Sequence, residues 1–177
     1  GGGGGGTSSS TTEGVYLSEY NANYGLGQIG AKAANDAGYT GSGVRVAVLD
    51  TGVNGSHVEF NSTSQTGRNF SGDTTSLTDI NGHGTHVASI IAGERDGSGM
   101  RGVAYDALIH SYKIFNDSGV ATGVDTDSEW SNVINYHSTD NIKISNNSWG
   151  SASIEMNEVN ENTILASYSN TVSSFKS

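Results

Sequence analysis

The feature that most constrains the fold is a short, almost wholly apolar run, VRVAVLD at residues 44–50, which ends in an acidic residue. A run of this length without polar alternation is typical of a strand that is buried on both faces, as in a parallel sheet. Two later segments, ALIHSYKIF at 107–115 and NIKISNNSWG at 141–150, predict two more strands. Three or four strands make a thin sheet with an exposed edge.

Helical patterns lie between these predicted strands. We expect helices over about 26–37, 85–93 and 127–137, a weaker helix in the tail after Gly150, and a long surface loop over 61–80. Alternating strands and helices predict an α/β fold, a doubly wound, mostly parallel sheet with helices on both faces. In such sheets the functional groups gather at the carboxyl ends of the strands. In the predicted helix over 127–137, we expect Asp127 to be the N-cap. One face of this helix is expected to carry a stripe formed by Trp130, Val133, Ile134 and His137.

Length, charge and cysteine content exclude several classes of function. A chain of 177 residues suits one domain, and 8 basic against 18 acidic residues give a net charge of −10. Such an acidic surface argues against nucleic acid and anionic lipid as partners, because both need basic patches. The absence of cysteine excludes disulfides, thiol nucleophiles and cysteine zinc sites. No apolar run approaches the ~20 residues of a membrane helix, so we expect no membrane insertion by this segment.

The amino-terminal segment differs in composition from the rest. Residues 1–6 are all glycine, and the sequence TSSSTTEG follows them. This composition predicts a flexible tether over residues 1–14, either a linker remnant or a spacer, because it cannot bury a core. The folded domain is therefore expected over residues 15–177.

A candidate pair of reacting groups combines Asp50, at the end of the first predicted strand, with His83. Gly82 and Gly84 flank the histidine, and the following helix would hold the imidazole by its amino end. Taken alone, Asp50 fits a turn cap, and His83 fits a structural residue, a metal ligand or a catalytic base.

Four segments in this order resemble the subtilisin-like serine proteases, namely VAVLDTGVNGSHVEF, NGHGTHVASIIAG, GVAYDALIHSYKIF and ISNNSWG. The resemblance covers about residues 25–150. It implies a doubly wound α/β fold and a serine endopeptidase, in which Asp50 matches the acid of the catalytic triad and His83 matches the base. His86 is then expected to be structural and to pack at the helix start.

The same resemblance implies where a polypeptide substrate binds. Ser148, Trp149 and Gly150 match an extended edge that hydrogen-bonds the substrate backbone, and NDSGVATG at 116–123 is expected to form the opposite edge. An alternative for Trp149 is a half-buried core position.

Two groups that the family needs have no match in the sequence. No segment after Gly150 resembles the G-T-S-x-A that carries the nucleophilic serine, and no A-G-N segment supplies the oxyanion-hole asparagine. The one GTS, at Gly6–Ser8, lies in the glycine-rich segment. We therefore expect the amino-terminal part of a protease, inactive without its carboxy-terminal half. A peptide-binding pseudoprotease is an alternative, and a metal hydrolase using His83, His86 and Asp50 is a third.

Further implications concern location and calcium. The segment GERDGSGMRGVAYDA at 93–107 resembles subtilisin-like domains of Gram-negative autotransporters, which implies secretion or attachment to the bacterial surface. No cofactor is required by the expected reaction. Calcium binds many family members, and Glu59 together with the loop over 94–99 occupies the matching place, although calcium needs six to eight oxygen ligands.

Overall fold

The computed structural model describes residues 12–60, 66–72, 76–121 and 127–150. The tail helix predicted after Gly150 and most of the predicted tether lie outside these residues. Helix α1 spans Thr12–Ala22, so the last three residues of the predicted tether are helical. Among the described helices, none has the length and apolar character needed to span a bilayer.

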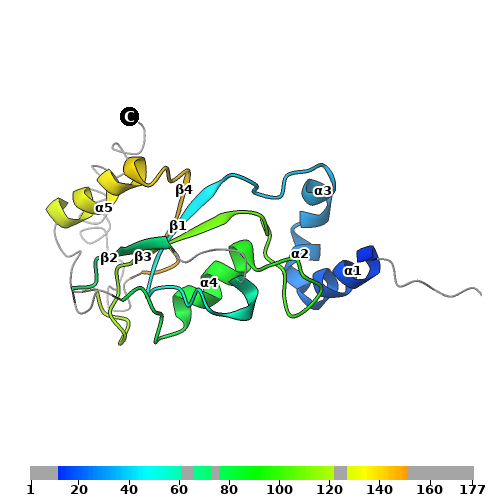
Figure 1. The fold of residues 1–177 in the computed structure, drawn as a ribbon, viewed down its shortest axis with the longest axis horizontal. Coiled ribbons are helices and arrows are strands. Elements are labelled where there is room, and N and C mark those ends of the chain that lie inside the picture. The colour runs from blue at the N-terminus through cyan, green and yellow to red at the C-terminus, as the bar shows by residue number, and fades with distance from the viewer. Residues whose placement is uncertain (1–11, 61–65, 73–75, 122–126, 151–177) are drawn as a thin grey trace, which may run out of the picture.

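Three short helices occupy one end of the molecule (Figure 1). They are α1, α2 over Tyr24–Gln28 and α3 over Ala31–Asp36. The helix predicted over 26–37 is therefore interrupted, because Gly30 takes the left-handed conformation with φ of 68°. Leu26 and Ala31 are buried together with Tyr20 in a small satellite core.

A four-stranded parallel sheet forms the centre of the fold. Its strands are β1 over Arg45–Asp50, β2 over Thr66–Asn69, β3 over Leu108–Lys113 and β4 over Ile144–Asn146, in the order β2-β3-β1-β4. Every pairing is parallel, as the sequence predicts.

The expectation of a continuous loop over 61–80 was wrong, because this segment contains β2. The sequence TGRN has no apolar residue and gives no strand signal. Its strand conformation comes from backbone pairing with β3, in which Gly67 lies opposite Ser111. A Cβ on Gly67 would come 2.0 Å from the Ser111 carbonyl oxygen, so only glycine permits this approach.

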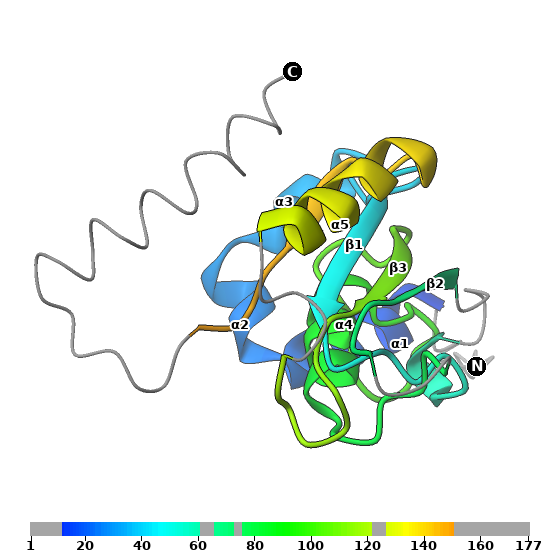
Figure 2. The same cartoon turned by 90° about the vertical axis from the view of Figure 1, so that its left-hand side faces the viewer.

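The side chains of β1 alternate between two cores on opposite faces of the sheet. Val46 and Val48 pack with helix α4, which spans His83–Ala92, whereas Ala47 and Leu49 lie with helix α5, which spans Asp127–Thr139. Figures 1 and 2 show these helices on opposite sides of the sheet. By the same alternation, Asp50 points to the side of α4.

A buried polar cluster on the α5 side joins β2, β3 and the end of α5. Arg68 donates two hydrogen bonds of 2.7 Å to the carboxylate of Asp140, and the Tyr112 hydroxyl donates a third of 2.8 Å. The His110 Nε2 atom lies 3.1 Å from the same carboxylate. The hydrogen bonds from Arg68 lower the pKa of Asp140 to about 2, although burial opposes this, and burial lowers the pKa of His110.

This cluster predicts that acid destabilises the fold. Asp140 and His110 both have lowered pKa values, so the unfolded chain binds more protons than the folded chain. The contribution of His110 is complete above pH 6.5 and declines as pH falls through its lower folded-state pKa, and that of Asp140 declines from pH 3.8 towards 2. Glu19 acts in the opposite direction, because burial raises its pKa above 4.5.

The variant Asp140→Asn tests the cluster. We expect the free energy of unfolding at pH 7, measured by urea titration, to fall by about 2–3 kcal/mol, because Arg68 loses its anionic acceptor. Asp36→Asn is the matched control, since Asp36 pairs with Lys32 at an exposed position and its loss should cost less than about 1 kcal/mol. Equal losses in the two variants would contradict this account.

Candidate active site

The end of β1 meets the start of α4 through a hydrogen bond between two side chains. The His83 Nδ1 atom lies 2.8 Å from Asp50 Oδ1. Asp50 is fully buried, whereas the His83 side chain is 51% exposed. The contact that the sequence predicts is therefore present. Its buried carboxylate orients a ring whose other face remains open to a reactant.

Glycine at 84 allows the close approach of these two elements. A Cβ at Gly84 would lie 2.1 Å from the carbonyl oxygen of Gly52 and 3.0 Å from the Asp50 Cβ atom. On the other side of the histidine, Gly82 has φ of 94° and forms the N-cap of α4. The first turn of α4 can therefore lie directly against the turn that follows Asp50.

A second carboxylate, Asp79, holds the two turns together and was missed in the sequence. Its Oδ1 atom accepts hydrogen bonds from Thr51 Oγ1 at 2.8 Å and from the Gly82 N–H at 2.9 Å. Its Oδ2 atom accepts from the Thr85 N–H at 2.9 Å and from Thr85 Oγ1 at 2.6 Å. Burial raises the pKa of Asp79, but these hydrogen bonds outweigh burial and lower it. The sequence feature that could have indicated this role is an acidic residue just before the start of a helix.

A buried lysine supports the site from the neighbouring strand. Lys113 lies opposite Asp50 in the register of β1 and β3 and is 1% exposed. Its Nζ atom donates to the Thr51 carbonyl at 2.6 Å and to Asp117 Oδ1 at 2.9 Å. Lys113 therefore links the turn after Asp50 to the loop that begins at residue 116. The sequence feature that could have indicated this role is a lysine within a mostly apolar predicted strand.

The segment Ser148–Gly150 directly follows β4. Within the described residues, no backbone hydrogen bond involves these three positions. The Trp149 ring is half-buried, stacks on Trp130 with centroids 5.5 Å apart and meets the Phe115 ring edge-on at 5.8 Å. The indole thus anchors the segment to the α5 core.

The structure places His86 on the exposed side of α4, so the expectation that it packs at the helix start was wrong. Positions 83 and 86 lie three residues apart, and only His83 faces β1. In the part of the chain that the structure describes, no group of three or more histidine, aspartate or glutamate side chains could hold a metal ion. The alternative of a metal site formed by His83, His86 and Asp50 therefore has no support in the geometry.

Glu59, the candidate calcium ligand, is buried against the loop that follows α4. Its Oε1 atom accepts the Met100 N–H at 3.2 Å, and Glu19 Oε2 accepts the Gly97 N–H at 3.1 Å. The second oxygen of each carboxylate is buried without a partner in the described residues. Among the described residues, the loop therefore directs one N–H donor at one oxygen of each carboxylate, whereas calcium would need six to eight oxygen ligands.

Comparison with known proteins shows which sequences this chain resembles. A profile of the subtilase family matches residues 41–176. An extracellular serine protease of Serratia marcescens is 42% identical over 110 residues, which are 60% of this chain and 10% of that protein. Subtilisin Savinase of Lederbergia lenta is 43% identical over 96 residues, which are 54% of this chain and 35% of that protein. The chain therefore spans only a part of these relatives.

A solved structure shows the same fold. The structure of sphericase superposes with a TM-score of 0.56 and 35% sequence identity, over 73% of this chain and 44% of that one. The predicted α/β fold, a parallel sheet with helices, is confirmed by this similarity.

The close approach at Gly84 yields a test of the site architecture. Gly84→Ala should lower the free energy of unfolding by about 2–4 kcal/mol, because the new Cβ would overlap the Gly52 carbonyl. Gly27→Ala in α2 is the control, because a Cβ there meets nothing within 4 Å and should be neutral or slightly stabilising. Urea unfolding followed by tryptophan fluorescence measures both. A neutral Gly84→Ala would show that the two turns are not packed together.

Proposed function

The chain belongs to the subtilase family, and on this basis we propose that it carries two of the three catalytic groups of a serine endopeptidase. Asp50 is the acid and His83 is the base. The observation that carries the proposal is the 2.8 Å contact between a fully buried carboxylate and a half-exposed imidazole. The activity of serine proteases among its relatives supports the reaction class.

The geometry defines what each group does in this reaction. In the neutral tautomer that donates Nδ1–H to Asp50, the Nε2 atom of His83 can accept the proton of a serine hydroxyl. The imidazolium that forms is stabilised by the buried carboxylate and then gives the proton to the leaving amine. Asp79 and Lys113 hold the turn after Asp50 and the start of α4 in place while this occurs.

The substrate in this proposal is an extended polypeptide. Ser148, Trp149 and Gly150, which form no backbone hydrogen bond among the described residues, offer their peptide groups to its backbone, and the loop from residue 116 contacts it from the other side. Three contacts support the use of this loop. Asn116 closes it by accepting hydrogen bonds from Ser118 and Val120, both of 3.0 Å, and Asp117 is held by Lys113.

In this proposal the nucleophile comes from a segment outside these 177 residues. No G-T-S-x-A or A-G-N segment follows Gly150 in this sequence. We therefore propose that this polypeptide by itself does not hydrolyse peptides, because serine and the oxyanion donor are both needed. It can still bind peptides through Ser148–Gly150.

We propose export to the bacterial surface, by an autotransporter route, as the location. The relative from Serratia marcescens, which is named as extracellular, and the character of the 93–107 segment support this. Protease digestion of intact cells tests it, and protection of the protein from digestion would contradict it. We assign no cofactor to the reaction. We also propose that Glu59 does not bind calcium, and a calcium-dependent rise in the thermal midpoint of the chain would contradict this.

A chimaera tests the catalytic assignment. Residues 41–150 of this chain would replace the matching segment of Subtilisin Savinase, which supplies the serine. We expect His83→Ala to lower kcat by about 10⁴–10⁶-fold and Asp50→Asn by about 10⁴-fold. His86→Ala is the matched control, because this exposed histidine on the same helix should leave kcat nearly unchanged.

The 177-residue chain provides the complementary measurement. It should not react with a fluorophosphonate probe, because it holds no serine activated by His83. Labelling that His83→Ala abolishes would show a nucleophile within this chain and would overturn the proposal of an inactive segment. In the chimaera, a His83→Ala variant that keeps its activity would overturn the assignment of the base.

A further inference from the structure

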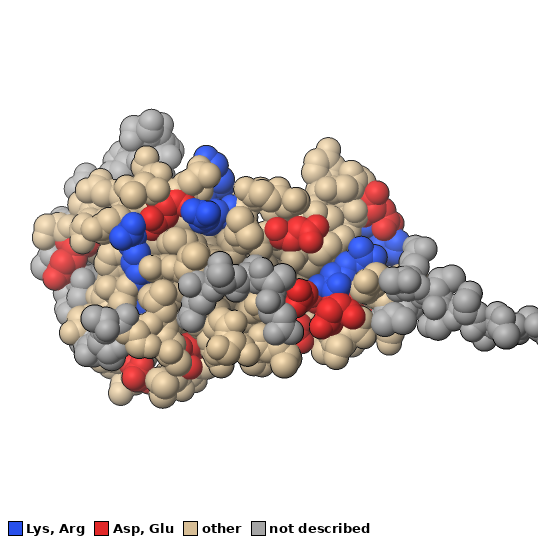
Figure 3. Space-filling view, in the orientation of Figure 1, with Lys and Arg blue, Asp and Glu red and all other residues tan. Residues whose placement is uncertain are grey.

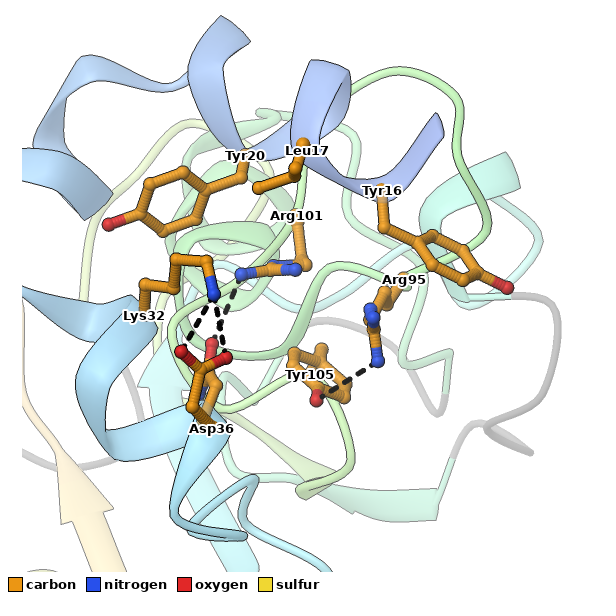
Figure 4. A pocket seen from close by; sticks show the side chains of 9 residues that line it. Tyr16, Leu17, Tyr20, Lys32, Asp36, Arg95, Arg101 and Tyr105 are labelled. Carbon is orange, nitrogen blue, oxygen red and sulfur yellow. Dashed lines mark hydrogen bonds and ion pairs between the residues drawn. The ribbon is translucent and has the colours of Figure 1, made fainter. Parts of the chain in front are cut away.

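A small cavity lies at the end of the molecule formed by α1 and α3 (Figure 4). Its volume is about 70 Å³, and α1, α3 and the loop after α4 contribute its walls. The side chains that matter are those of Tyr16, Tyr20, Asn35, Arg95, Arg101 and Tyr105. Neither Asp50 nor His83 lines it, so the cavity is separate from the candidate active site.

Two arginines line this cavity, and each guanidinium lies against tyrosine rings. The Arg95 Cζ atom is 4.2 Å from the centroid of the Tyr16 ring and 5.4 Å from that of Tyr105. The Arg101 Cζ atom is 5.0 Å from the Tyr20 ring and 5.1 Å from the Tyr105 ring. Such stacking orients the two planar cations without neutralising their charge.

Neutral partners hold the arginines further in place. Arg101 is 5% exposed and donates from Nη2 to Asn35 Oδ1 at 3.1 Å. The Arg95 Nη1 atom lies 3.5 Å from the Tyr105 hydroxyl. In both side chains the Nε atom is buried and has no partner among the described residues.

Among the described residues, no carboxylate lies in direct contact with either arginine, although the chain is strongly acidic. Across the described residues, neither Arg95 nor Arg101 forms an ion pair within 4 Å, whereas Lys32 at the same cavity pairs with Asp36 at 2.7 Å. The Glu19 Oε2 atom accepts the Gly97 N–H of the loop after α4, and the charge of Arg101 acts on this carboxylate without a direct contact. Figure 3 shows lysine and arginine atoms gathered at this end of the molecule, with acidic atoms beside them.

We propose that this cavity is a binding site for a small carboxylate anion, held between Arg95 and Arg101. Neither guanidinium has a carboxylate within 4 Å among the described residues, and an incoming carboxylate would supply that contact. Guanidinium groups match a planar carboxylate through paired hydrogen bonds. The flat tyrosine walls and the volume of about 70 Å³ suit a group of the size of acetate, such as the end of a carboxylate ligand.

Titration of the full 177-residue chain with sodium acetate tests the site. Sodium chloride is exchanged for acetate at constant ionic strength, and the NMR signals of the arginine Nε–H groups report binding. We expect saturable shifts, and we expect Arg101→Gln to weaken the apparent affinity at least about tenfold. Lys143→Gln is the matched control, because it removes the same charge at an exposed position outside the cavity and should bind acetate like the parent chain.

Several results would overturn the inference. They are shifts that do not saturate, equal affinity in Arg101→Gln and the parent, or equal weakening by Lys143→Gln. Tighter binding of inorganic phosphate than of acetate, by tenfold or more, would overturn the assignment to carboxylates. Circular dichroism checks the fold of each variant, and Arg95→Gln takes the place of Arg101→Gln if the latter does not fold.

Discussion

The hydrogen bond between a buried carboxylate at the end of β1 and an imidazole at the start of α4 is the interaction on which the candidate site depends. It forms only because two turns come within contact of each other, which the missing side chain of Gly84 permits. A buried carboxylate is costly unless it is hydrogen-bonded. Asp50 Oδ1 accepts from the Thr51 N–H and pairs with His83, whereas Oδ2 is buried without a partner among the described residues. The position of the imidazole is thus fixed by its contact with one oxygen of this buried charge.

The sheet places different polar networks on its two faces. On the α4 side, Asp79 and Lys113 join the strand ends to the loops that surround Asp50. On the α5 side, the Asp140 carboxylate contacts Arg68, Tyr112 and His110 and so links the short strand β2 to β3. Asp79 and Asp140 each accept hydrogen bonds from several donors, and this lets a thin sheet carry charged groups close to its core.

Some parts of the fold could be predicted because their signals are local. The apolar run of β1 and the helical spacing after His83 depend on neighbouring residues, so both elements were predicted within two residues of their bounds. The strand β2 could not be predicted, because its conformation arises from pairing with a segment more than 40 residues away. The break at Gly30 and the exposure of His86 also depend on how α2, α3 and α4 pack, which the pattern does not record.

The sequence by itself determined the α/β class, the acidic charge, and the identity and order of the aspartate and histidine, because these follow from residue types and short-range periodicity. Only the tertiary structure decided which groups meet. Asp79, Lys113, Arg95 and Arg101 acquire their surroundings from contacts between segments that lie far apart in the chain. Such contacts depend on the three-dimensional packing of sheet and helices, and no short stretch of residues encodes them.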